Sequence, residues 1–180
     1  MTSGDMLTQW LEQSDAVRAR MLAGGGKPGL AAPEHFAGKT GLEQMQAMLE
    51  GSMPYPYIAE TLDFALIEIG AGKATFQGIP QLKHYNPLGS VHGGWYATLL
   101  DSAVGCAVHT MMPVGRGYTT AELSVNIVRA ASHKSGPLRA IGSVIHCGKQ
   151  LATAEGRIVG PDGKLYAHAT TTCLVFEMVK

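Results

Sequence analysis

A single acid lies inside the most apolar stretch of the chain. Asp101 is the only formally charged residue between Gly93 and Met112. Burying a polar group without a partner costs about 1 to 3 kcal/mol, and burying a carboxylate costs more. Asp101 is therefore a candidate catalytic carboxylate, although an acid that merely bonds a neighbouring Ser, Thr or backbone amide would give the same pattern.

A histidine and two glycines stand where this apolar stretch begins. His92 is followed at once by Gly93 and Gly94. If a helix starts here, its first backbone amides are not covered by side chains, and the helix dipole makes this end mildly electropositive. Such a place suits a carbonyl oxygen that gains negative charge. The alternative is that the glycines only permit close packing and that His92 caps the helix.

The spacing of these residues constrains how they can act together. His92 and Asp101 are nine residues apart, which on an α-helix is roughly 13 Å and two and a half turns. They therefore lie on opposite faces and do not meet within one chain. If both act on one substrate atom, Asp101 must come from a second subunit related by a two-fold axis, which gives two sites per dimer.

The composition also favours an oligomer. Hydrophobic residues make up 46% of the chain and charged residues 16%, which is apolar for a soluble protein and suggests surface buried between subunits. Fourteen basic residues balance fourteen acidic ones, without the positive footprint that nucleic acid or an anionic membrane would require. We expect neither as a partner.

The elements that position these residues follow from periodicity. Apolar residues at helical spacing predict an amphipathic helix over residues 7–22, and a second short helix begins at the capping-box pair Thr40 and Glu43. Residues 1–54 are expected to form a helical extension and linker, and residues 55–180 the main domain. In that domain we predict a helix from Gly93 to about Met112 and strands over 62–70, 73–79, 118–129, 138–147, 151–159 and 165–176.

The order of these elements predicts the fold class. Two strands, one long apolar helix and four further strands are most simply arranged as an antiparallel sheet that curves around the enclosed helix. This is the α+β arrangement known as the hotdog fold. The pattern of the first residues does not fit a signal peptide, so we expect none, and the three widely spaced cysteines form no Cys-x-x-Cys pair. We therefore expect a cytoplasmic protein with reduced thiols.

The candidate residues together form the pattern Asn86-x5-His92-Gly93-Gly94-x6-Asp101. This pattern resembles the signature of the PaaI-like thioesterases of the hotdog superfamily. The similarity extends over roughly residues 58–178, and it includes the segments 117–123, 136–138 and 167–173.

The resemblance implies hydrolysis of acyl-CoA thioesters without a metal or organic cofactor, in subunit pairs that usually form a tetramer. It implies that Gly93 polarises the thioester carbonyl while Asn86 and His92 orient the thioester. Asp101 of the partner subunit would activate water or attack directly, and the two mechanisms share every residue named here. Thr120, or else Thr119, would help to hold the water.

Four cations are candidates for contact with the phosphates of CoA. Arg129, His133, Lys134 and Arg139 surround the loop between two predicted strands, where cations can meet nucleotide phosphates. Isolated surface Lys and Arg residues are more often simply solvated. Gly94 and Thr119 are the remaining expected substrate contacts.

Two other functions remain open. A hotdog acyl-CoA dehydratase would need a histidine aligned with a carboxylate for proton removal beside a carbonyl, and the spacing from His92 to Asp101 fits a thioesterase better. A non-catalytic acyl-CoA sensor would keep a pocket but would not need Asp101. Incubation with acyl-CoAs distinguishes the three functions. Release of CoA indicates a thioesterase, hydration without release indicates a dehydratase, and binding without turnover indicates a sensor.

Overall fold

The predicted central helix forms α5 (Gly93–His109), and it organises the core. The computed structural model describes residues 2–178. Side chains spaced three or four residues apart on α5, including Leu99, Leu100 and Ala103, are fully buried, because one helical face meets the sheet. The opposite face is less covered, and Asp101 on it is half-buried. The helix ends at His109, before the predicted end at Met112.

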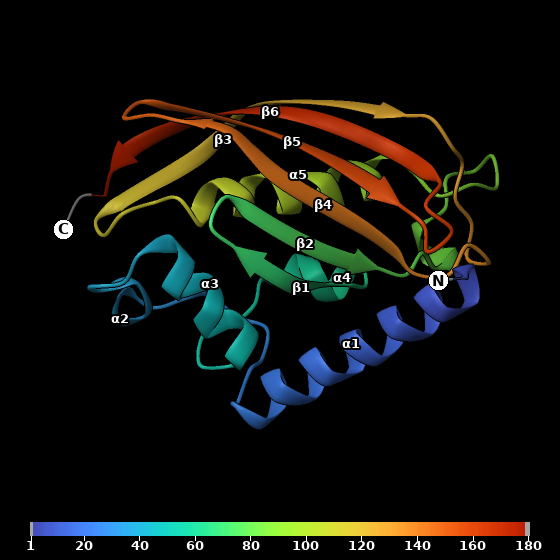
Figure 1. Cartoon of the computed structure of the whole chain (residues 1–180), viewed down its shortest axis with the longest axis horizontal. Coiled ribbons are helices and arrows are strands. Elements are labelled where there is room, and N and C mark those ends of the chain that lie inside the picture. The colour runs from blue at the N-terminus through green and yellow to red at the C-terminus, as the bar shows by residue number, and fades with distance from the viewer. Residues whose placement is uncertain (1, 179–180) are drawn as a thin grey trace.

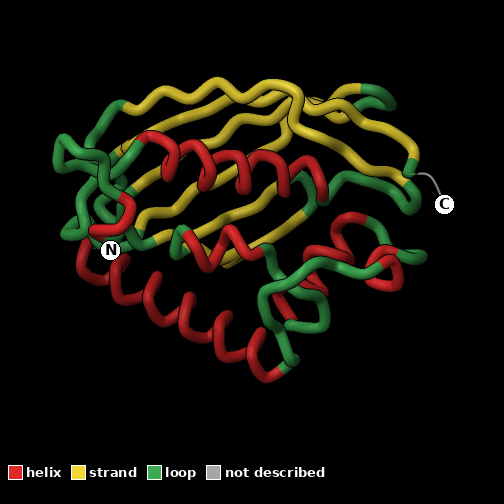
Figure 2. Tube along the Cα trace, turned by 180° about the vertical axis from the view of Figure 1, so that it is seen from behind, coloured by secondary structure: helices red, strands yellow, loops and turns green. Residues whose placement is uncertain are grey.

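A six-stranded antiparallel sheet curves around α5 (Figures 1 and 2). Its strand order is β1-β2-β4-β5-β6-β3, so β1 and β3 form the two edges and the sheet does not close. The predicted hotdog fold is therefore confirmed. The strands are β1 (Phe64–Gly70), β2 (Lys73–Gly78), β3 (Arg116–Ile127), β4 (Leu138–Cys147), β5 (Leu151–Val159) and β6 (Leu165–Glu177).

A bulge in β3 changes which of its side chains face α5. The pairing of β3 with β6 shifts between Thr120 and Glu122. Because side chains alternate along a strand, one additional residue moves the following side chains to the other face. Thr120 can therefore contact α5 on the same face on which Leu123 and Val125 pack against the core.

Four helices precede the sheet: α1 (Ser3–Ala23), α2 (Pro33–Phe36), α3 (Gly41–Glu50) and α4 (Tyr57–Thr61). A 3-10 turn, η1 (Leu82–His84), follows β2. Of these helices, α1, α3 and α4 contact the edge strand β1. The predicted capping box is present, since Thr40 Oγ1 accepts from the Glu43 N–H and the Glu43 carboxylate accepts from the Thr40 N–H. The sequence pattern did not predict α2, α4 or η1.

Helix α1 lies on the side of the β1–β2 edge that is turned away from α5 (Figure 1). Its Trp10 ring packs against the guanidinium of Arg139, 4.4 Å from the ring centre. The division of the chain at residue 54 stays a prediction. Within residues 2–178, no helix has the length and apolar content needed to cross a membrane.

Candidate functional site

The N-terminus of α5 presents one unpaired backbone donor. His92 is the N-cap residue, and its Nδ1 accepts a hydrogen bond of 2.9 Å from the Gly94 N–H. In the neutral ring, the proton must then be on Nε2, which is free to donate because His92 is exposed. Among residues 2–178, the Gly93 N–H has no hydrogen-bond partner, as expected for the first amides of a helix.

Asn86 shapes the loop that leads to His92. Its Oδ1 accepts from the N–H groups of Leu88 and Ser90, at 2.9 and 3.3 Å, and its Nδ2 donates to Ser90 Oγ at 3.1 Å. The loop is joined to η1 because the His92 N–H donates to the His84 carbonyl at 2.8 Å. The hydrogen bonds of the Asn86 side chain thus lie within its own turn.

Asp101 and Thr120 are in contact within one chain. The resemblance implied only that Thr120, or else Thr119, helps to hold the water, and that role stays a prediction. Thr120 Oγ1 donates to Asp101 Oδ1 at 3.1 Å, whereas Thr119 is exposed on β3. Both threonines line a shallow cavity of about 380 Å³ between β3, the end of α5 and the N-terminal helices. Open space therefore lies beside the hydroxyl that holds the carboxylate.

A cysteine close to Asp101 is not a plausible nucleophile. Burial, with a smaller contribution from the charge of Asp101, raises the pKa of Cys106 to about 12. A thiol with this pKa stays protonated at neutral pH, and the thiolate is the reactive form. The carboxylate is the better candidate for the chemistry.

Gly93 and Asp101 are far apart within the chain. Helix α5 is continuous from Gly93 to His109, so the separation of eight positions between Gly93 and Asp101 corresponds to about 12 Å along the axis. One substrate atom cannot be within hydrogen-bond reach of both groups of a single chain.

Three of the four expected cations lie beside the loop that holds His92. The loop after β3 is joined to it by a hydrogen bond from the Val91 N–H to the Ala131 carbonyl, at 3.2 Å. Arg129, His133 and Lys134 of this loop are exposed.

Two tyrosines that sequence reasoning missed hold this cationic loop in place. Tyr85 O–H contacts both Nδ1 and the backbone N–H of His133, at 2.8 and 2.9 Å. Tyr96 O–H donates to the Arg129 carbonyl at 3.3 Å and accepts from the Ala131 N–H at 2.6 Å. Their position next to the His-Gly-Gly segment was the only signal in the sequence, and it does not reveal their partners.

Arg139 is a correction to the expected cation group. Its side chain is buried under α1, where Nε donates to Gln77 Oε1 at 2.9 Å and a terminal nitrogen donates to Gln13 Oε1 at 3.0 Å. Burial lowers the pKa of Arg139 to about 10. The side chain is buried and two of its nitrogens donate within the protein, so we exclude it from phosphate binding. In the sequence, Arg139 lies close to the loop that contains His133 and Lys134. Because side chains alternate along β4, however, the side chain of Arg139 points to the face of the sheet that α1 covers.

The segment that contains these candidate residues matches a known protein family. Residues 88–167 match the thioesterase superfamily. The matched segment contains His92, Gly93, Asp101 and Thr120, and the predicted resemblance to PaaI-like thioesterases is confirmed.

Two proteins that are similar to this chain are described as an esterase and a thioesterase. A Halobacterium salinarum protein, provisionally named an esterase, is 40% identical over 75 residues, which cover 41% of this chain and 48% of the relative. The match thus spans about half the length of that relative. A Ralstonia eutropha protein described as a thioesterase related to phenylacetic acid degradation has a solved structure that is 29% identical. Its TM-score is 0.65, with 72% of this chain and 97% of the other covered.

A more distant structure shows the fold alone. A mutant of the phenylacetic acid degradation protein PaaI from Thermus thermophilus is 24% identical, with a TM-score of 0.59. The alignment covers 65% of this chain and 96% of the other.

Proposed function

We propose that the protein hydrolyses acyl-CoA thioesters to a free acid and CoA, at sites shared between two subunits. The match of residues 88–167 to the thioesterase superfamily supports thioester hydrolysis in general. The observation that carries the finer proposal is the unpaired Gly93 N–H at the positive end of α5, together with a half-buried Asp101 held by Thr120.

In the proposed reaction, the thioester carbonyl lies at the N-terminus of α5. The Gly93 N–H donates to the carbonyl oxygen, and the dipole of α5 stabilises the negative charge that develops on it. His92 Nε2–H is a second donor at the same end, and the turn formed by Asn86 keeps His92 in position. Gly94 leaves space for the substrate.

Asp101 of the partner subunit would supply the base. It takes a proton from water as the oxygen of that water bonds to the carbonyl carbon, and Thr120 orients the carboxylate. The C–S bond then breaks, and the CoA thiolate receives a proton. Direct attack by the carboxylate to give an anhydride uses the same residues, and labelled water in a single turnover distinguishes the two because only the anhydride route carries label into Asp101.

The edge strand and the exposed face of α5 support the shared site. β3 is an edge strand with unpaired backbone groups, which favour pairing with another chain. It lies next to the face of α5 that carries Asp101. A second copy packed across this region would cover both features and bring its α5 close to the first.

Arg129, His133 and Lys134 are proposed to contact the CoA phosphates. They are exposed on the loop that is hydrogen-bonded to the segment before α5. Phosphates there would lie at the same end of the molecule as the thioester.

A panel of acyl-CoAs with a thiol reagent tests the proposed function. We expect release of free CoA, and the preferred acyl group identifies the substrate. Hydration of an enoyl-CoA without CoA release would instead support a dehydratase, and tight binding without turnover would support a sensor.

A further inference from the structure

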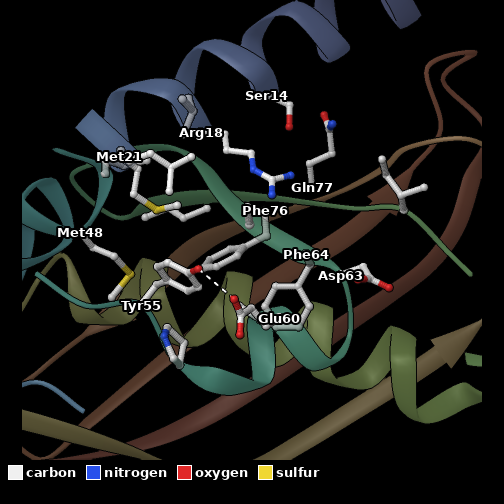
Figure 3. A pocket seen from close by; sticks show the side chains of 18 of the residues that line it. Ser14, Arg18, Met21, Met48, Tyr55, Glu60, Asp63, Phe64, Phe76 and Gln77 are labelled. Carbon is white, nitrogen blue, oxygen red and sulfur yellow. Dashed lines mark hydrogen bonds between the residues drawn. The ribbon is translucent and has the colours of Figure 1, made fainter. Parts of the chain in front are cut away.

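A second cavity, of about 410 Å³, lies beside the β1 edge of the sheet, between α1, α3 and α4 (Figure 3). All of its lining residues fall between residues 14 and 81, before the segment that matches the thioesterase superfamily. None of the residues proposed for catalysis lines it. The cavity is therefore a feature of the N-terminal helices and the first hairpin.

One side of this cavity is apolar and adaptable. Met21 of α1 and Met48 of α3 face the aromatic rings of Phe64 and Phe76 across it (Figure 3). Methionine side chains are flexible and polarisable, so they can adjust to the shape of a hydrocarbon group. This side suits an aliphatic or aromatic tail.

A buried amide at the cavity lacks a partner for its N–H groups. Gln77 is only 4% exposed, and its Oε1 accepts the hydrogen bond from Arg139 Nε. Because the guanidinium can only donate, this bond fixes which end of the amide is nitrogen. Gln77 Nε2 has no hydrogen-bond partner among the described residues, and the side chain points toward α1 along the cavity wall (Figure 3).

Arg18 provides a positive charge in the lining of the same cavity. Its side chain extends from α1 toward Phe76 (Figure 3), and within residues 2–178 no salt bridge involves it. The two acids of the lining are already engaged. Glu60 accepts from Tyr55 O–H at 3.2 Å, and Asp63 pairs with Lys83 at 2.9 Å.

We propose that this cavity binds a monocarboxylate with a hydrophobic tail. The carboxylate accepts a hydrogen bond from the Arg18 guanidinium and, after a rotation of the Gln77 side chain that turns its covered Nε2 toward the cavity, a second one from Gln77 Nε2. The tail packs against Met21, Met48 and Phe76. A hydrogen bond from Gln77 Nε2 to the charged carboxylate offsets the free-energy cost of burying this amide without a partner. This site is additional to the proposed thioesterase site and does not depend on its activity.

Calorimetric titration of the full chain with sodium octanoate tests the proposal. We expect saturable binding, at least roughly tenfold weaker for 1-octanol, because a hydrogen bond to a charged group contributes enough to change an affinity by that factor. Arg18→Met and Gln77→Glu should each weaken octanoate binding by a similar factor. Arg157→Met makes the same substitution at an exposed arginine of β5 and should leave it unchanged.

Methyl NMR of methionine-labelled wild-type protein gives a readout that needs no substitution. The signals of Met21 and Met48 should shift during the titration, while that of the exposed Met111 should not. Absence of saturable binding, or binding that leaves the Met21 and Met48 signals unchanged, would overturn the proposal.

Discussion

The surroundings of Asp101 are compatible with its proposed role as the catalytic carboxylate. Among residues 2–178 it accepts one hydrogen bond, from the neutral Thr120 hydroxyl, and no salt bridge neutralises it. One carboxylate oxygen is therefore left to accept a proton from water. A hydroxyl orients the group without competing for its charge.

Asp101→Asn should lower kcat for the preferred acyl-CoA by at least about a hundredfold, since the amide cannot act as a general base or nucleophile. KM and the circular dichroism spectrum should change little. Steady-state kinetics measures the effect, and Ser102→Ala is a matched control that removes only a hydrogen bond to the Thr98 carbonyl on the same helix. A near-wild-type kcat for Asp101→Asn would remove Asp101 from the mechanism.

At the scale of elements, the position of α5 depends on a close approach to β4. A Cβ added to Gly142 would lie 2.3 Å from the backbone oxygen of Ala103. Neither backbone can yield without moving the helix. The glycine therefore sets the distance between α5 and the sheet, and with it the place of Asp101.

Gly142→Ala should destabilise the protein by about 1 to 3 kcal/mol, the usual cost of overpacking. Urea denaturation followed by circular dichroism measures this. Gly70→Ala is the control, because an added Cβ there meets no atom within 4 Å, and its effect should stay within about 0.5 kcal/mol. Equal stability of the two variants would show that α5 is not held at this contact.

A histidine joins the end of α5 to α3 and makes the contact sensitive to acid. His109 Nε2 lies 2.9 Å from Gln44 Oε1, and burial lowers the pKa of His109. Because the unfolded chain then binds protons more readily than the folded one, stability rises with pH and is lost as the pH falls below about 6.5. His84 acts in the same direction, since burial also lowers its pKa.

The melting temperature of the wild type should therefore fall between pH 7 and pH 5, and that of His109→Gln should fall less. Differential scanning calorimetry at both pH values measures the difference. An identical pH dependence in the two proteins would show that His109 does not titrate on unfolding.

At the scale of the whole molecule, the proposed site is incomplete in one chain. The amide donor and the acid are about 12 Å apart on the same rigid helix, while β3 leaves one sheet edge open. We therefore expect at least a dimer in sedimentation, and an active monomer would contradict the shared site.

Mixing inactive chains tests this directly. Asp101→Asn combined with His92→Ala should recover activity, because half of the dimers are mixed and each contains one site with both intact groups. Recovery should approach about a quarter of wild-type activity per chain if the sites are independent. If mass spectrometry confirms subunit exchange and activity stays at the level of the parents, the two groups do not act across an interface.

The sequence by itself determined the features that depend on local pattern. The ranges 138–147 and 151–159 coincide with β4 and β5, and the capping box of Thr40 and Glu43 is formed as predicted. Periodicity and capping involve residues close together in the chain, so they can be recognised without a fold. The segment from Asn86 to Asp101 was recognised for the same reason.

Only the tertiary structure decided which side chains meet. The bulge in β3 selected Thr120 rather than Thr119 as the partner of Asp101, and the packing of α1 placed Arg139 beneath Trp10. Register and helix docking are set by contacts between distant segments, and one residue of shift reverses the side to which a side chain points. The cavity beside β1 arose in the same way, from helices that the sequence pattern does not position.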